Sequence, residues 1–343
     1  MSLRLAQRVQ RIRPSPTVSI TALAGRLREE GKDIIGLSAG EPDFQTPDHV
    51  REAACEAIRA GETKYTAVDG TSSLKAAIRE KFRRDNDLEF QDEEIIVSSG
   101  GKQACYNACQ ALLETGDEVV IPTPCWVSYP DMVRLTNAQP VSVHTSAEAG
   151  YRMTPEQLRG AITAQTRALI INSPSNPTGA VYSHADWLAL GDVLREHPRI
   201  AIITDDIYEH IYWGQEPFCS FLSACPDLRD RVLTVNGVSK CYAMTGWRLG
   251  YAAGPVDLIK AMTTLQSQST TNASSISQAA ACAALSGDQG FVTESCRAFK
   301  ERHDFVLERL DALPGFACRP AEGAFYAFPA IGEAIARVGV ADD

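Results

Sequence analysis

The sequence predicts an α/β protein whose central sheet is mostly parallel and is covered by helices on both faces. From Glu94 onward, short runs of apolar residues alternate with longer helix-like segments. Each of five runs ends in a distinctive cluster of polar residues or glycines, as in an open sheet that binds a ligand outside the carboxyl ends of its strands. The five strands are expected at 95–97, 118–121, 167–171, 200–203 and 232–235.

The residues before this sheet are predicted to form an extended arm followed by helices. Prolines at positions 14 and 16 suit an arm that lies against another surface. Apolar residues at helical spacing then predict a helix over 17–30, which ends at Gly31. A turn-rich loop at 38–44 and helices at 48–60 and 72–86 come next.

Composition indicates an ordinary globular protein, with 44% hydrophobic and 22% charged residues among 343, and the length favours one large domain plus a smaller one. The formal charge of −10 argues against non-specific binding to nucleic acid. No apolar run reaches the ~18 residues that span a membrane, and the N-terminus lacks a secretory apolar core. Ten irregularly spaced cysteines, without a CxxC pair or zinc-site pattern, indicate free thiols in a reducing cytoplasm and no metal site.

The most distinctive stretch is 236–254, which is rich in small residues and contains Lys240 and Arg248. A lysine becomes a nucleophile toward a carbonyl when burial or a nearby cation lowers its pKa. Arginine keeps its proton and binds phosphate oxygens through paired hydrogen bonds. The two residues together predict a phosphate-bearing cofactor held covalently, and pyridoxal 5′-phosphate requires this pair. Two unrelated surface charges are the alternative, which the apolar run before Lys240 disfavours.

Part of this stretch forms a motif made of Ser239, Lys240, Thr245, Gly246, Trp247, Arg248, Leu249, Gly250 and Tyr251. The motif resembles the signature of class I aminotransferases, which are pyridoxal phosphate enzymes, and is most similar to the bacterial aspartate aminotransferase subgroup, some members of which also accept prephenate. The resemblance implies a seven-stranded, mostly parallel sheet between helices and a smaller α/β domain. It implies an N-terminal arm, helix and loop at 1–44, a large cofactor-binding domain at 45–290 and a partial small domain at 291–343.

Three loops are expected to hold the cofactor. Gly101 and Lys102 open a helix whose free backbone amides and dipole form an anion site for the phosphate. Trp126 offers a ring face on which a pyridine ring can stack, with core packing as the alternative. Asn176 lies in a rigid, proline-bracketed loop, and the resemblance implies that it binds the phenolic oxygen of the cofactor and the substrate carboxylate.

Asp205 and Tyr208 follow the fourth predicted strand. A buried carboxylate keeps the pyridine nitrogen of the cofactor protonated, so that the ring accepts electrons from the substrate Cα. The resemblance gives that role to Asp205, with Asp206 as the rival, and gives Tyr208 the phenolic oxygen. Gly237 stands where relatives often have a phosphate-binding serine. Ser239 is therefore expected to bind the phosphate in its place, with one donor fewer to the phosphate as the alternative.

The resemblance also implies residues for the substrate and for a second subunit. The backbone of Gly40 is expected to contact the substrate carboxylate, with Trp126 nearby. Arg13 in the arm resembles a basic residue that is associated with prephenate in this subgroup. Tyr65 resembles a tyrosine that reaches the cofactor phosphate of the neighbouring subunit, which predicts a homodimer.

These residues predict transamination between an acidic L-amino acid, aspartate or glutamate, and a 2-oxo acid. Lys240 would hold the cofactor as an internal aldimine, be displaced by the substrate amine and then move the Cα proton, with ping-pong kinetics. The alternatives are a lyase or decarboxylase on the same fold, or a catalytically impaired cofactor-binding homologue. A transcription regulator and an NAD-dependent dehydrogenase are disfavoured, because no helix-turn-helix pattern and no GxGxxG motif is found.

The resemblance breaks off at the C-terminal end. A helix is predicted over 294–313 and a strand over 323–328, after which relatives continue through a further strand and helix. In relatives that part carries the arginine for the substrate α-carboxylate, and no residue here can be assigned the role. We therefore expect an incomplete small domain, cofactor binding that survives and substrate binding that is weakened.

Overall fold

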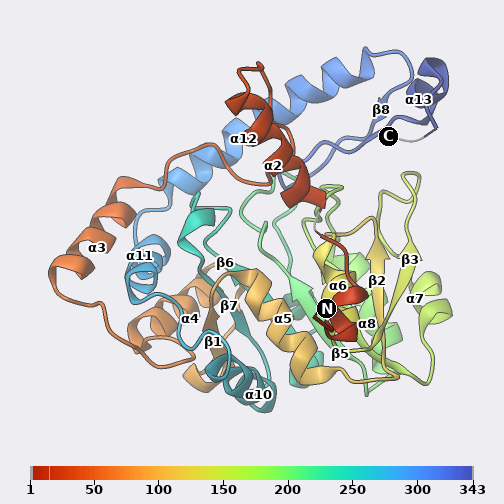
Figure 1. The fold of residues 1–343 in the computed structure, drawn as a ribbon. Helices are drawn as coiled ribbons and strands as arrows, with labels where there is room; N and C mark the ends of the chain where they lie inside the picture. The colour runs from red at the N-terminus through yellow and green to blue at the C-terminus, as the bar shows by residue number, and fades with distance from the viewer. Residues whose placement is uncertain (1–2, 15, 342–343) are drawn as a thin grey trace.

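The computed structural model describes residues 3–14 and 16–341 and confirms the α/β architecture. A seven-stranded sheet runs in the order β1-β7-β6-β5-β4-β2-β3 (Figure 1). Adjacent strands from β6 to β3 are parallel, whereas β7 is antiparallel to both β6 and β1. The strands are β1 Ile95–Ser98, β2 Glu118–Thr123, β3 Gln139–His144, β4 Thr166–Asn172, β5 Ala201–Asp205, β6 Val232–Gly237 and β7 Gly250–Ala253.

Helices cover both faces of the sheet, and alternate residues of the strands other than the edge strand β3 enter two separate apolar cores. In β1, Ile95 and Val97 belong to one core and Ile96 to the other. Because both faces are buried, the strands read as continuous apolar runs instead of alternating with polar residues. The helices are α1 Gln7–Gln10, α2 Pro16–Glu29, α3 Asp48–Arg59, α4 Ser72–Asn86, α5 Gly101–Leu112, α6 Ser128–Leu135, α7 Pro155–Ala161, α8 His184–Arg195, α9 Phe221–Ala224, α10 Val256–Ser267, α11 Ser275–Ser286, α12 Gly290–Asp311 and α13 Gly332–Val338.

Two strands of the sheet carry no clear signal in the sequence. β3 lies at the sheet edge, where only part of the strand is buried and a proline interrupts the pattern. β7 is made of Gly-Tyr-Ala-Ala, whose small residues lack the bulk of an ordinary strand. An added Cβ on Gly250 would lie 2.2 Å from the backbone nitrogen of Gly101, so only glycine lets β7 pass the start of α5. The five predicted strands are all present, and each is one or two residues longer than predicted.

The predicted strand at 323–328 is wrong. The segment forms only one isolated bridge, between Gly323 and Tyr212, and a two-stranded sheet pairs β8 Ala317–Cys318 with β9 Pro329–Ala330 instead. The aromatic residues of the segment pack against side chains of the large sheet's loops rather than against a neighbouring strand, with the Phe325 and Tyr208 rings 5.6 Å apart. The apolar run therefore does not form a strand here, and Ala324, with a φ of 56°, interrupts any extended chain.

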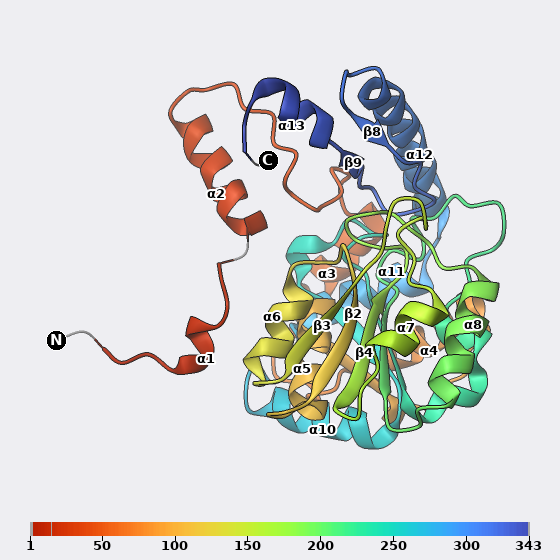
Figure 2. The ribbon, with the colours of Figure 1, turned by 90° about the vertical axis from the view of Figure 1, so that its right-hand side faces the viewer.

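The chain ends lie apart from the body of the sheet. Figure 1 shows α12 and α13 on one side of it, and Figure 2 shows α1 at its margin, where α1 contacts α6 and Arg11 donates to Asn137. α2 carries exposed apolar side chains such as Ile20 and Leu23. The division at 44 and 290 stays a prediction. None of the helices in residues 3–14 and 16–341 combines the length and apolar character needed to cross a membrane.

A buried ion pair ties α4 to the strands that carry the site. Lys81 is 1% exposed and pairs with Glu209, which follows β5. The side-chain amides of Asn86 and Asn236 each donate to Glu209 at 2.9 Å, one to each carboxylate oxygen. Burial opposes ionisation of Glu209, but the Lys81 ammonium lowers its pKa, so the carboxylate stays charged. The contacts of Glu209 therefore hold together three elements: α4, the loop after β5 and strand β6.

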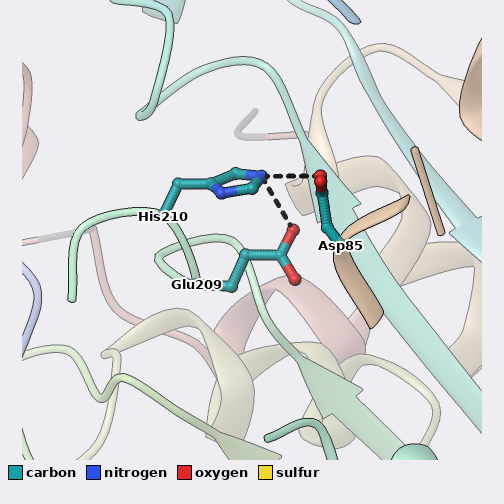
Figure 3. Close-up of side chains that lie close together, drawn as sticks. All are labelled: Asp85, Glu209 and His210. Atoms are coloured by element: carbon teal, nitrogen blue, oxygen red, sulfur yellow. Dashed lines mark ion pairs between the residues drawn. The ribbon is translucent and has the colours of Figure 1, made fainter. Parts of the chain in front are cut away.

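His210 and Asp85 extend this network toward the surface (Figure 3). The Nε2 atom of His210 lies 3.3 Å from a carboxylate oxygen of Asp85 and 3.3 Å from one of Glu209. An acid–acid–histidine group of this kind is also a possible metal site. Here the Lys81 ammonium already pairs with Glu209, and two amides occupy its other lone pairs, so the group is an ion-pair network.

We predict that Lys81→Met lowers the free energy of unfolding by ~3–5 kcal/mol, because Glu209 is left buried without its counter-charge. The control is Arg83→Met, which removes an exposed pair with Glu80 on the same helix and should have little effect. Urea unfolding of both variants measures the difference. Equal losses would show that the buried pair contributes no more than a surface pair.

Candidate active site

The carboxyl ends of the parallel strands border one cavity of about 630 Å³. Its walls come from the loops after β1, β2, β4, β5 and β6, as the sequence predicts. Ten of the twelve predicted site residues line it, and the two that do not are Tyr65 and Arg13. The ten are Gly40, Gly101, Lys102, Trp126, Asn176, Asp205, Tyr208, Ser239, Lys240 and Arg248.

Lys240 presents its amine to this cavity. The Nζ atom donates to the carbonyl oxygen of Gly40 at 2.5 Å and lies 5.8 Å and 5.7 Å from the ring centres of Tyr208 and Phe325. Burial lowers its pKa to about 8, and the nearby cation of Arg248 adds to the effect while Asp205 opposes it. A substantial fraction of the amine is therefore uncharged at neutral to mildly alkaline pH, as a nucleophile requires.

Arg248 lies against the start of α5. Its guanidinium donates to the carbonyl oxygens of Thr245 at 2.7 Å and Ser99 at 3.4 Å. A Cβ on Gly100 would come within 2.5 Å of the guanidinium, so a glycine at this position gives the arginine its space. The cation and the free amides at the start of α5 meet at one place, which is a binding site for a doubly charged anion.

Lys102 and Trp126 form a further part of the wall. The Lys102 ammonium lies 4.8 Å from the centre of the Trp126 ring, and burial followed by the Arg248 charge lowers its pKa. Trp126 packs edge-on against Tyr129, with ring centres 5.2 Å apart. Trp126 therefore both packs against a neighbouring side chain and lines the cavity. Ser239 is buried and also borders the cavity.

Two carboxylates line the cavity, the exposed Glu41 and the buried Asp205. Tyr129 donates its hydroxyl to one carboxylate oxygen of Asp205 at 2.6 Å, and the amide of Ile207 donates to the other at 3.2 Å. Burial raises the pKa of Asp205, although these two hydrogen bonds favour the charged form. The rival, Asp206, is 1% exposed and does not line the cavity, and burial raises its pKa well above the ordinary value. The geometry thus favours Asp205.

The structure adds two residues that the sequence did not single out. Tyr129 holds Asp205 from behind, and its position in the run after Trp126 gives no sign of that contact. Tyr326 reaches into the cavity from the C-terminal segment, where its hydroxyl lies 2.6 Å from that of Tyr208. The aromatic pair after Gly323 was a possible signal, but spacing alone could not connect residues more than a hundred positions apart.

Tyr65 and Arg13 lie outside this cavity within one chain. Tyr65 is 89% exposed in the loop before α4. Arg13 lines an adjacent cavity of about 530 Å³ that shares Lys102 and Arg248 with the first. Of the arginines in the described part of the chain, Arg248 is the only one that lines the Lys240 cavity. The roles predicted for Tyr65 and Arg13 stay predictions.

The residues present fit pyridoxal 5′-phosphate. A buried amine of lowered pKa, an anion site made of Arg248 and the start of α5, and a buried carboxylate converge on one cavity. The Cβ-free position at Gly100 leaves the room that the arginine and a phosphate need. Fold and site together thus define a pyridoxal phosphate-dependent enzyme.

The chain belongs to the class I and II aminotransferases, because the model of that family matches residues 32–340. An aspartate/prephenate aminotransferase of Nitrosomonas europaea is 54% identical over 336 residues, which cover 98% of this chain and 85% of the relative. An aspartate aminotransferase of Rhizobium meliloti is 52% identical, over 95% of this chain and 79% of the relative. The protein is accordingly a pyridoxal phosphate-dependent aminotransferase, which moves an amino group between an amino acid and a 2-oxo acid.

Solved structures agree with this assignment. The crystal structure of the Rhizobium meliloti aspartate aminotransferase superposes with a TM-score of 0.93 at 50% identity, covering 97% of this chain and 83% of that one. The Thermus thermophilus aspartate aminotransferase with maleate gives 0.92 at 45% identity, over 96% and 85% of the two chains. The seven-stranded sheet and its helical layers are thus those of the family.

We predict that the rate at which Lys240 captures pyridoxal phosphate rises with pH, reaches half its maximum at about pH 8 and levels off above that midpoint. The uncharged amine is the nucleophile, and its lowered pKa puts half of it in that form at about pH 8. Stopped-flow absorbance on the cofactor-free protein measures the profile, with Lys240→Ala as the control. A rate that keeps rising to pH 10 would mean an ordinary, solvated lysine.

Proposed function

We propose that the enzyme transfers the amino group of an acidic L-amino acid, aspartate or glutamate, to a 2-oxo acid, with prephenate as a further acceptor. The printed names of its relatives support this substrate class, and the Thermus relative holds maleate, a dicarboxylate. The single observation that carries the chemistry is the buried Lys240 amine beside Arg248 and Asp205 in one cavity. A lyase or decarboxylase has no specific observation in its favour.

We propose the following roles for the cofactor-holding residues. Arg248, Ser239 and the amides of Gly101 and Lys102 bind the phosphate, because a cation and a helix start favour a doubly charged anion. Asp205 holds the proton on the pyridine nitrogen, and Trp126 packs against the ring face. When bound, the cofactor supplies an electron-accepting ring that stabilises a carbanion at the substrate Cα.

Lys240 is the general base in this proposal. Its amine would hold the cofactor covalently, and the free amine would be the base that takes the proton from the substrate Cα. Tyr208 and Asn176 donate hydrogen bonds to the phenolic oxygen of the cofactor, and the backbone of Gly40 borders the substrate carboxylate.

We propose a homodimer in which Tyr65 of each chain contacts the phosphate of the other. An 89% exposed tyrosine and the exposed apolar side chains of α2 are consistent with a surface that another chain covers. Arg13 is proposed to lie beside the substrate in that assembly, since it already borders Lys102 and Arg248. We also propose a cytoplasmic location, because all ten cysteines are free thiols.

Incubation with aspartate and 2-oxoglutarate should produce glutamate in amounts equal to the oxaloacetate formed. Lys240→Ala should reduce the rate by ~10³-fold or more, and Lys240→Arg, which keeps the charge but not the nucleophile, should be as inactive. Coupled assays for glutamate, ammonia and carbon dioxide distinguish the reactions. Release of ammonia or carbon dioxide without glutamate would favour the lyase or the decarboxylase.

Tyr65→Phe should weaken pyridoxal phosphate binding by about tenfold, the effect of one hydrogen bond to a charged group. Sedimentation equilibrium should give twice the 37.2 kDa mass of one chain for both proteins. The dissociation constant comes from tryptophan fluorescence of the cofactor-free enzyme. A monomeric protein, or an unchanged constant in a dimer, would contradict the assignment of Tyr65.

A further inference from the structure

We propose that Tyr326 and Tyr208 act as one hydrogen-bonding unit, with Asn176 bonded to the Tyr326 oxygen, and that the unit presents a single hydroxyl proton to an anionic oxygen of the ligand beside Lys240. Tyr326 is then a positioning residue for Tyr208 that the resemblance did not indicate. The inference rests on the proposed function, since it concerns the oxygen that Tyr208 and Asn176 are proposed to bind. It adds how the two hydroxyl protons are used, which the proposed function does not specify.

The three side chains meet at one point of the cavity wall. The hydroxyl oxygens of Tyr326 and Tyr208 lie 2.6 Å apart, and the side-chain amide nitrogen of Asn176 donates to the Tyr326 oxygen at 3.2 Å. The two rings pack edge to face with centres 5.7 Å apart. All three residues line the cavity that holds the Lys240 amine. The contact is therefore internal to the site and not a remote packing feature.

The number of protons fixes what the pair can do. An amide nitrogen only donates, so the bond from Asn176 takes a lone pair of the Tyr326 oxygen. The two hydroxyls carry two protons, and the bond between their oxygens uses one. The described part of the chain offers neither hydroxyl another acceptor. The remaining proton is free for whatever fills the cavity, and a negatively charged oxygen is the acceptor that binds it most strongly.

Both hydroxyls keep their protons at neutral pH. Burial raises the pKa of Tyr326 to about 12 and raises that of Tyr208 well above its ordinary value. The carboxylate of Asp205 acts in the same direction on both groups. The pair is thus a donor to the ligand, not a base.

The backbone around Tyr326 holds its hydroxyl in place. The amide of Ala324 donates to the Ile211 carbonyl at 2.8 Å, and the Trp213 indole donates to the Ala321 carbonyl at 2.8 Å. These bonds fasten the C-terminal segment to the turn that follows Tyr208. On the other side, a Cβ on Gly40 would lie only 2.9 Å from the Tyr326 hydroxyl oxygen, so glycine makes the space for it.

The test is a double-mutant cycle of Tyr208→Phe, Tyr326→Phe and the two combined. The dissociation constant of pyridoxal 5′-phosphate is measured with the cofactor-free full chain, and the pH midpoint of the absorption change with the loaded enzyme. We expect Tyr326→Phe alone to weaken binding about threefold to tenfold and to shift the midpoint. In the Tyr208→Phe background the same change should have a clearly smaller effect, because the unit is already broken.

The matched control is Tyr212→Phe, which removes a hydroxyl bonded to the Glu216 carbonyl at 2.8 Å outside the cavity. It should leave both readouts unchanged. Two outcomes overturn the inference but leave the proposed function intact. One is a Tyr326→Phe effect that is at least as large in the Tyr208→Phe background as in the natural chain, and the other is no effect in the natural chain. A natural chain whose Lys240 does not capture the cofactor overturns the proposed function and this inference together.

Discussion

Removing the Lys240 amine from water is the constraint on which the site depends. An ammonium is strongly hydrated, so enclosing it favours the neutral form, and the cation of Arg248 strengthens that preference. The same enclosure requires the amine to have a partner, which the Gly40 carbonyl supplies at 2.5 Å. A loop near the N-terminus and a segment 200 residues later are thus joined at the reacting atom.

The buried ion pair between Lys81 and Glu209 supports the position of the Lys240 amine. Lys81 and Glu209 form a buried pair whose amide partners include Asn236, four residues before Lys240. The loop after β5 and the end of β6 therefore cannot shift independently. A reactive group keeps its position when the residues around it are themselves held by packing and hydrogen bonds. Lys81, Glu209 and Asn236 give Lys240 this kind of support.

Sequence patterns predicted the parts of the fold whose signals are local. Five strands and α4 follow from apolar runs and helical spacing, and the polar clusters after the strands predicted one shared pocket. The family resemblance supplied the roles of individual residues such as Gly40, Tyr208 and Ser239. β7 was missed because small residues there serve the close approach of Gly250 to Gly101, which only the folded chain reveals. Tyr326 was missed for a related reason, since its partners Tyr208 and Asn176 are more than a hundred residues away. Residues that are far apart in the sequence show no periodic pattern that would predict their contact.

The loop that contains Gly40 is also fastened to α12. Phe44 packs against Phe299 with ring centres 5.2 Å apart, and Asp43 pairs with Arg302 at 2.7 Å. Gly40 contributes the carbonyl for Lys240, and its missing side chain leaves room for the Tyr326 hydroxyl. The position of α12 therefore bears on two contacts of the site at once, the hydrogen bond from Lys240 to Gly40 and the space beside Gly40 that the Tyr326 hydroxyl occupies.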